Sequence, residues 1–116
     1  MTAEILRAAF EVAGTIGHGF LEGVYQRALA YELELAGLTV LREAPFRVMY
    51  KGREMGTYIA DLIIEGRIIV ELKAIEAQLG AAHVAQCLNY LRASGLKTAL
   101  LINFGRPHID YKRVSL

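Results

Sequence analysis

The sequence predicts an α/β fold of the α+β sandwich type, with a mixed β-sheet flanked by helices. Two helical patterns come first, three extended segments follow in succession, and a third helix precedes an apolar run typical of a buried strand. The expected order is α-α-β-β-β-α-β-(β), the last strand being short. A length of 116 residues suits one domain over residues 1–116.

Three segments carry the helical pattern. Apolar residues recur at helical spacing over Ala3–Ile16, and Gly17 ends this first helix. A second helix is expected from about Leu21 to Ala36, because Gly37 is well placed as a C-terminal stop. The third helix is expected over Gln78–Ala93.

The strands are predicted from extended apolar segments bounded by turn residues. Pro45 is expected to interrupt the first of them, since proline cannot donate to a sheet ladder. Glu65-Gly66 indicates a hairpin between the second and third. The expected strands are Thr39–Tyr50, Thr57–Ile64, Ile68–Leu72, Thr98–Phe104 and a short edge strand over Lys112–Val114.

Composition narrows the functional classes. Hydrophobic residues make up 54% of the chain and charged residues 22%, which is globular but apolar for a small domain and favours a homo-oligomer. The formal net charge of +1 lacks the strong positive field of a dedicated nucleic-acid binder, so any polyanion must be bound through a local basic patch, through a metal, or weakly.

The cellular compartment is predicted from the cysteine count and from the lengths of the apolar runs. Cys87 is the single cysteine, so no intramolecular disulfide ties the chain to an oxidising compartment. No apolar run approaches membrane-spanning length, and the first residues do not resemble a signal peptide. We expect a cytoplasmic protein that does not engage a membrane.

Charged residues embedded in apolar strands are the strongest functional signal. Asp61 lies within Tyr-Ile-Ala-Asp-Leu-Ile-Ile, and Glu71 and Lys73 end the segment Ile-Ile-Val-Glu-Leu-Lys. A buried carboxylate needs a cation, hydrogen bonds or solvent. Glu71 and Lys73 are two residues apart, so on a regular strand they share a face.

The hairpin register decides whether the two acids meet. A two-residue loop at Glu65-Gly66 would pair Asp61 with Val70 and place the acids on opposite faces. An odd-numbered loop or a bulge puts them on one face, with Cβ atoms within about 4.5–8 Å. We predict the odd register.

Two carboxylates with a lysine suit a hard divalent cation. Mg²⁺ and Mn²⁺ take one or two carboxylates together with water and substrate phosphate. Such a cation would activate water for phosphodiester hydrolysis, and Lys73 would orient that water and stabilise transition-state charge. The alternative is structural: a surface salt bridge between Glu71 and Lys73, with Asp61 capping a turn.

Further motifs give the pattern a family resemblance. Residues 19–25 fit G-x-x-E-x-x-Y, Asp61 is followed by Glu71-Leu72-Lys73, residues 86–91 read Gln-Cys-Leu-Asn-Tyr-Leu, and residues 101–105 read Leu-Ile-Asn-Phe-Gly. Over nearly the whole chain this resembles the GxxExxY protein family, a branch of the PD-(D/E)XK nuclease-like superfamily. The resemblance implies a restriction-endonuclease-like core. One departure is Ala60, which stands where the superfamily motif has proline.

The resemblance also implies roles. Asp61 and Glu71 match the metal ligands, Glu22 matches a supporting acid on the preceding helix, and Lys73 matches the catalytic lysine. Gln86 matches a glutamine that completes the site.

Other side chains are candidates for contacting the substrate. Tyr25 follows Glu22 by three residues and is either a ligand of phosphate or carboxylate or an aromatic residue of the core rim. Tyr90 shares a helix face with Gln86 and with His83, which we interpret as a polar surface residue. Two basic sets could contact phosphates without reading sequence: Arg42, Arg47, Lys51 and Arg53, and Arg106, Lys112 and Arg113.

Two functions follow. The first is a Mg²⁺- or Mn²⁺-dependent nuclease hydrolysing phosphodiester bonds of DNA or RNA. The second is a catalytically silent nuclease-like protein that binds nucleic acid or protein as an oligomeric module. Zinc spacing, glycine-rich phosphate loops and a G-x-S-x-G motif are absent, and we expect no haem, flavin or nucleotide cofactor.

Overall fold

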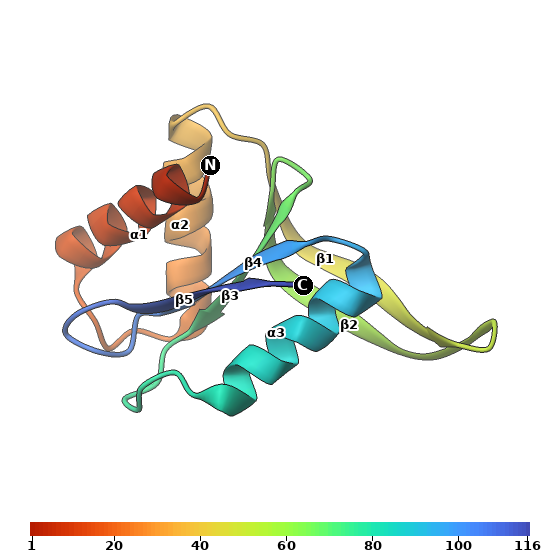
Figure 1. Cartoon of the computed structure of the whole chain (residues 1–116). Helices are drawn as coiled ribbons and strands as arrows, with labels where there is room; N and C mark the ends of the chain where they lie inside the picture. Colours follow the sequence, from red (N-terminus) through yellow and green to blue (C-terminus); the bar gives the residue numbers. More distant parts are fainter.

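Five strands form one sheet in the order β1-β2-β3-β4-β5 in the computed structural model, which describes residues 1–116 (Figure 1). The predicted α+β order is confirmed. The helices are α1 (Thr2–Ile16), α2 (Glu22–Leu35) and α3 (Ala81–Ser94), and the strands are β1 (Val40–Tyr50), β2 (Arg53–Ile64), β3 (Ile68–Lys73), β4 (Thr98–Asn103) and β5 (Asp110–Ser115).

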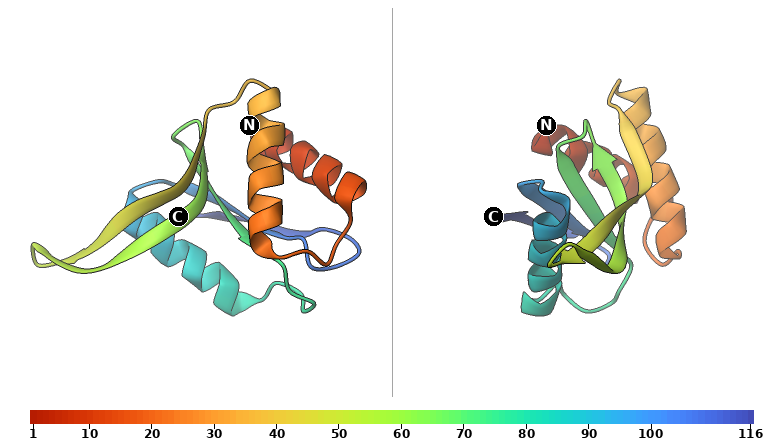
Figure 2. Two further views of the ribbon diagram at one scale, coloured as in Figure 1. Left: turned by 180° about the vertical axis from the view of Figure 1, so that it is seen from behind. Right: turned by 90° about the vertical axis from the view of Figure 1, so that its right-hand side faces the viewer.

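The sheet is mixed because one of its connections crosses over. β1, β2 and β3 follow one another as antiparallel neighbours, and β5 returns antiparallel to β4. β3 and β4 are parallel, and α3 carries the chain between them. Helices α1 and α2 lie on one side of the sheet and α3 on the other (Figures 1 and 2).

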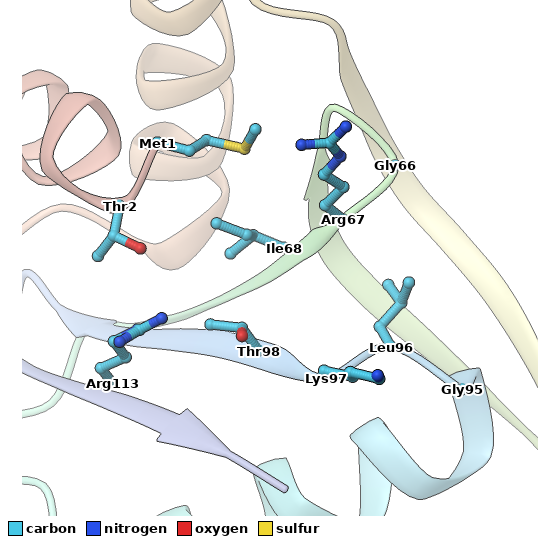
Figure 3. A pocket seen from close by; sticks show the side chains of 10 residues that line it. All are labelled: Met1, Thr2, Gly66, Arg67, Ile68, Gly95, Leu96, Lys97, Thr98 and Arg113. Atoms are coloured by element: carbon cyan, nitrogen blue, oxygen red, sulfur yellow. The ribbon is translucent and has the colours of Figure 1, made fainter.

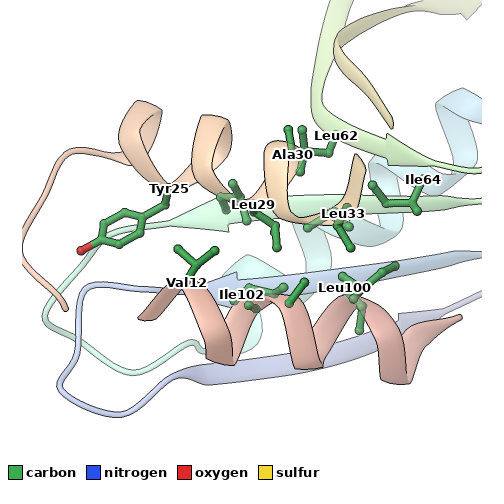
Figure 4. Packing of buried hydrophobic residues seen from close by; sticks show 14 of the residues in the cluster. Val12, Tyr25, Leu29, Ala30, Leu33, Leu62, Ile64, Leu100 and Ile102 are labelled. Carbon is green, nitrogen blue, oxygen red and sulfur yellow. The ribbon is translucent and has the colours of Figure 1, made fainter. Parts of the chain in front are cut away.

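Each face of the sheet has its own apolar core. On the face covered by α1 and α2, Leu29 and Leu33 of α2 pack with Leu62, Leu100 and neighbouring side chains (Figure 4). On the α3 face a smaller cluster includes Cys87 and Leu91 of the helix. The two cores follow from the alternation of side chains along the central strands, since successive residues point to opposite faces.

The elements differ from the predictions in several places. Pro45 does not interrupt β1 but pairs with Ile59, because β1 is an edge strand with one unpaired side. β2 begins at Arg53, earlier than expected, and forms a tight hairpin with β1 through Lys51-Gly52, both at positive φ. α3 begins at Ala81, where the Nδ1 atom of His83 accepts the Gly80 N–H at 3.0 Å.

The β1–β2 hairpin extends beyond the body of the molecule (Figure 2). Its tip lies beyond the helices, and the hairpin carries exposed apolar side chains, among them Met49, Met55 and Ile59. The sheet centre is covered on both faces, so the chain divides into a packed body and a projecting arm. None of the three helices combines the length and the apolar character needed to cross a membrane.

Candidate metal centre

Asp61 and Glu71 come together at the point where β2 and β3 separate. The three-residue loop Glu65–Arg67 pairs Leu62 with Val70, so the next residues outward are Asp61 and Glu71, on one face. The predicted odd register is therefore confirmed. The regular antiparallel pairing ends at Leu62 and Val70, immediately before the two acids.

Beyond the last backbone pair, the two carboxylates accept the hydrogen bonds that join β2 to β3. The Asp61 N–H donates to Glu71 Oε1 at 3.2 Å, and the Leu72 N–H donates to Asp61 Oδ2 at 2.8 Å. Each acid therefore satisfies a main-chain donor of the opposite strand, and the strands are held apart by side chains at this point. One oxygen of each carboxylate, Asp61 Oδ1 and Glu71 Oε2, has no hydrogen-bond partner within the protein.

Tyr58 is a member of this cluster that the sequence did not indicate. Its hydroxyl donates to Glu71 Oε1, the oxygen that also accepts the Asp61 N–H. Its ring stacks on Tyr90 of α3, with centroids 3.4 Å apart. A tyrosine in an extended segment is ordinary, so only the fold reveals this contact. Tyr58 fixes the Glu71 carboxylate and joins it to α3.

Burial dominates the electrostatics of the two strand acids. Burial and the neighbouring Asp61 raise the pKa of Glu71 to about 7, against the hydrogen bonds from Tyr58 and the Asp61 backbone and the charge of Lys73. Burial also raises the pKa of Asp61, although the Leu72 N–H and Lys73 lower it. Two adjacent acids that resist ionisation form a site that gains stability when a cation binds.

Glu22 and Lys73 complete the charge cluster. Partial burial and the Asp61 carboxylate raise the pKa of Glu22, whereas Lys73 lowers it. Lys73 lowers the pKa of all three acids, so its ammonium lies within electrostatic reach of each. One turn after Glu22, Gln26 Nε2 donates to the Asp61 carbonyl at 3.4 Å, which fixes the start of α2 against β2.

The donor set fits a hard divalent cation only in part. Two unpartnered carboxylate oxygens, with water and phosphate, meet the needs of Mg²⁺ or Mn²⁺. No group of three or more His, Cys, Asp or Glu side chains is gathered as a ready set of metal ligands, so Glu22 does not form a three-ligand set with the two strand acids. Asp61 and Glu71 are the residues present that would hold the ion.

The structure buries the Tyr25 side chain in the core. The side chain is fully buried, and its ring stacks on Phe104 with centroids 4.6 Å apart. Its hydroxyl donates to the Gly17 carbonyl at 2.7 Å and accepts the Phe20 N–H at 3.2 Å, which closes the α1–α2 loop. These contacts agree with the alternative interpretation of Tyr25 as an aromatic residue of the core. They leave no exposed surface on Tyr25 for a phosphate.

A groove beside Tyr58 brings together two of the predicted substrate-binding residues. It lies between the β1–β2 hairpin and α3 and has a volume of about 510 Å³. Arg47 and Tyr90 line it together with Arg92, which the sequence did not single out. Gln86 lies near enough to the Tyr90 hydroxyl to lower its pKa, although burial and Glu71 raise it overall.

Lys51 is not part of this assembly. It occupies the tip of the hairpin, ten residues before Asp61 and so roughly 30 Å away along an extended strand. There its ammonium lies 5.4 Å from the centroid of the Tyr50 ring. Of the basic residues near the first strands, Arg47 is therefore the one that the fold brings to the groove.

The loop after Lys73 is fixed by buried polar contacts. Asn103 is fully buried, and its Nδ2 donates to the carbonyls of Ile75 at 3.0 Å and Ala77 at 3.1 Å. Its Oδ1 accepts the N–H groups of Ile75 and Gly105. The sequence carried a signal for this role, since Asn103 ends an apolar strand just as Glu71 interrupts one.

Comparison with known proteins identifies the family. A profile of the PD-(D/E)XK nuclease superfamily matches residues 1–114, so the chain belongs to that superfamily. Members of this superfamily typically use divalent metals.

The crystal structure of SSO0001 has a similar fold, with a TM-score of 0.60 and 19% sequence identity. The similarity covers 80% of this chain but only 48% of that one, so this chain spans about half its length. None of the curated proteins compared with the sequence matches it.

Proposed function

We propose that the protein is a divalent-metal-dependent nuclease that hydrolyses phosphodiester bonds of DNA or RNA. The observation that carries the proposal is the meeting of Asp61 and Glu71 where β2 and β3 separate, with Lys73 on the same face. A divalent cation there would supply Lewis acidity to the attacking water and neutralise charge on the phosphate.

The protein's own residues have separable roles in this scheme. Asp61 and Glu71 would hold the ion through Oδ1 and Oε2, while their other oxygens stay fixed by backbone donors. Tyr58 would keep Glu71 in one orientation. Lys73 would donate to the attacking water or to a phosphate oxygen and offset the charge that develops there.

The groove beside Tyr58 supports a path for the nucleic-acid strand. Arg47 and Arg92 line it and would pair with backbone phosphates, and the exposed part of the Tyr90 ring would stack on a base. Because Tyr90 stacks on Tyr58, and Tyr58 contacts Glu71, a strand in this groove would lead to the acids. No base-reading element is involved, so we propose cleavage without strong sequence preference.

The motif set favours one branch of the superfamily. Gly19, Glu22 and Tyr25 fit the G-x-x-E-x-x-Y pattern, and we propose that the chain is a GxxExxY protein. The fold suggests a physical reason for the pattern's spacing: Tyr25 closes the loop before α2, and Glu22 then stands at the start of that helix, toward Asp61.

A second candidate is a catalytically silent module that binds nucleic acid or protein, as a homo-oligomer. Two observations favour it: the acids do not form a ready set of three ligands, and Met49, Met55 and Ile59 are exposed on the projecting hairpin. In this reading the same groove would hold a ligand without cutting it.

Cleavage assays with matched variants separate the two functions. Wild type is incubated with Mg²⁺ or Mn²⁺ and single-stranded, double-stranded and branched DNA and RNA, beside Asp61→Asn, Glu71→Gln and Lys73→Met. We expect each variant to lose on the order of a hundredfold or more in rate. Glu76→Gln, which changes an exposed acid in the loop after Lys73, is expected to retain full rate.

The contrary outcome is equally specific. If wild type binds neither ion and cuts no substrate, yet binds nucleic acid as tightly as the acid variants do, the silent module is correct. Full activity in Asp61→Asn or Glu71→Gln would refute the proposed centre even if wild type cuts.

A further inference from the structure

A second polar pocket lies at the opposite end of β3 and β4 from the acids (Figure 3). It has a volume of about 490 Å³, within the range of small-molecule sites. Ile68, the first residue of β3, lies between Arg67 and Arg113 in this view. The pocket is lined by Met1, Thr2, Gly66, Arg67, Ile68, Gly95, Leu96, Lys97, Thr98 and Arg113.

The charge of this pocket has one sign. Arg67, Lys97 and Arg113 line it, and no acidic residue does. None of the three forms an ion pair, since the one salt bridge in the chain joins the Met1 amino group to Glu4. The whole chain has 13 basic and 12 acidic residues, so three uncompensated cations around one pocket are a local excess. Their mutual repulsion favours a bound anion.

The cations reach the pocket from three separate segments. Arg67 ends the β2–β3 loop, Lys97 precedes β4, and Arg113 lies on β5. Arg113 pairs with Leu100, whose side chain belongs to the core under α1 and α2, so Arg113 is on the α1 face of the sheet. Lys112, its neighbour, pairs with Leu101 of the opposite core and so lies on the α3 face.

The start of α1 adds uncharged donors. This helix of 15 residues has no side-chain cap, and its hydrogen-bond ladder begins with Ile5 N–H to the Met1 carbonyl at 3.2 Å. The N–H groups of the first turn therefore have no partner within the helix and lie at its positive end. Thr2 and Thr98 bring hydroxyl groups to the same pocket.

We propose that this pocket binds a phosphate group carried by a ligand, separately from the acidic centre. Three cations and a helix N-terminus match the charge and the several oxygens of a phosphate monoester better than those of a single carboxylate. The monoester has two possible sources, the phosphorylated end of a nucleic-acid strand and a small phosphorylated metabolite. Both present the same chemistry to Arg67 and Arg113.

Calorimetric titration of the full chain tests the site. Inorganic phosphate, adenosine 5′-monophosphate, and one oligonucleotide with either a 5′-phosphate or a 5′-hydroxyl end are titrated into wild type, Arg67→Ala and Arg113→Ala. We expect saturable binding by wild type and a loss of about tenfold in affinity in each variant, as for one removed charge-assisted pair. Lys112→Ala, which removes the same charge from the other face, is expected to bind like wild type.

The oligonucleotide pair identifies the source. Preference for the 5′-phosphate end, lost in Arg113→Ala, assigns the pocket to nucleic-acid ends, whereas tighter binding of the monophosphate assigns it to a metabolite. The proposal fails if wild type shows no saturable binding of any probe, or if Lys112→Ala weakens binding as much as Arg113→Ala. Binding to Glu71→Gln is expected to match wild type, so this result is independent of the nuclease proposal.

Discussion

The end of β3 and the outer half of the β1–β2 hairpin are held in place by different means. Around Glu71 and Lys73, buried side chains replace missing backbone contacts: the two acids bridge the strands, and Asn103 fixes the following loop. The hairpin tip is held by ladder bonds, with a register shift between Val48 and Met49, and no helix covers it. The first region fixes its charged side chains through hydrogen bonds, and the second projects from the body and carries basic side chains. Substitutions should therefore change stability at the centre and affinity on the hairpin.

The largest stability effect is expected for Asn103→Ala. Four hydrogen bonds to the loop after β3 are lost, and buried backbone donors and acceptors of that loop are left without partners. We expect a loss on the order of 3 kcal/mol in the free energy of unfolding, measured by urea denaturation. Asn89→Ala, at an exposed asparagine whose side chain hydrogen-bonds only to Arg92, should change the free energy of unfolding by less than about 0.5 kcal/mol. Equal effects would contradict the role assigned to Asn103.

Gly105→Ala is expected to come next. A Cβ atom at Gly105 would overlap the backbone of Ala74 and Ile75, so the loop after Lys73 would have to move. We expect a loss of roughly 1–3 kcal/mol by the same measurement. Gly14→Ala is the control, because a Cβ there meets nothing within 4 Å and alanine favours the helix. A Gly105 variant as stable as wild type would show that this loop is not tightly packed.

Glu71→Gln is expected to stabilise the metal-free protein in a pH-dependent way. The folded-state pKa of Glu71, about 7, lies above the ordinary value of 4.5. Stability from this group is thus fully present below about pH 4.5 and is lost as the pH rises through about 7. At pH 8 in chelator the glutamine variant should be more stable by roughly 1–3 kcal/mol, while at pH 5 the two should differ little.

Thermal unfolding with and without Mg²⁺ tests that reading of Glu71. Added Mg²⁺ should raise the melting temperature of wild type at pH 8 and leave Glu71→Gln unchanged, because only the ionised pair attracts the ion. An equal gain of stability at pH 5 and pH 8 would instead point to packing rather than charge.

The smallest effect on folding is expected on the hairpin. Arg47→Ala should leave the free energy of unfolding within about 0.5 kcal/mol of wild type, because the side chain is exposed. It should weaken binding to single-stranded DNA and reduce the slope of log affinity against log salt by about 1. Fluorescence anisotropy at several salt concentrations measures both. Arg53→Ala, an exposed hairpin arginine outside the groove, is the matched control.

The sequence allowed the pairing of the two acids to be predicted, because charged residues within apolar strands need a partner. Asp61 and Glu71 interrupt apolar strands, and a shared cation requires an odd hairpin loop, which the register confirms. Pro45 misled the boundary prediction, because whether a strand lies at an edge depends on the whole sheet. The role of Tyr58 could not be predicted from the sequence, since its partners lie on a different strand and on a helix.

Other parts of the site depended on the direction of side chains, which the spacing of residues in the sequence does not show. Tyr25 looked like a neighbour of Glu22, but its side chain turns inward to Phe104 and the α1–α2 loop. Arg113 and Lys112 looked like one basic patch, yet strand alternation sends them to opposite faces of the sheet. Asn103 could have been found by the reasoning applied to Glu71, because it too is a polar residue in an apolar strand.

Two of the acidic residues join the strands with carboxylate hydrogen bonds in place of backbone ones, so they serve the fold as well as the proposed metal site. Asp61 and Glu71 each accept a backbone N–H of the neighbouring strand, a bond that an amide oxygen would also make, so selection for folding alone would keep either the acid or its amide at both positions. Glu22 and Lys73 hold no backbone group with their side chains. If the proposed function holds, loss of the lysine or of the helix acid among related sequences would mark a chain without catalysis, whereas a hydrogen-bonding side chain at positions 61 and 71 would be retained for folding.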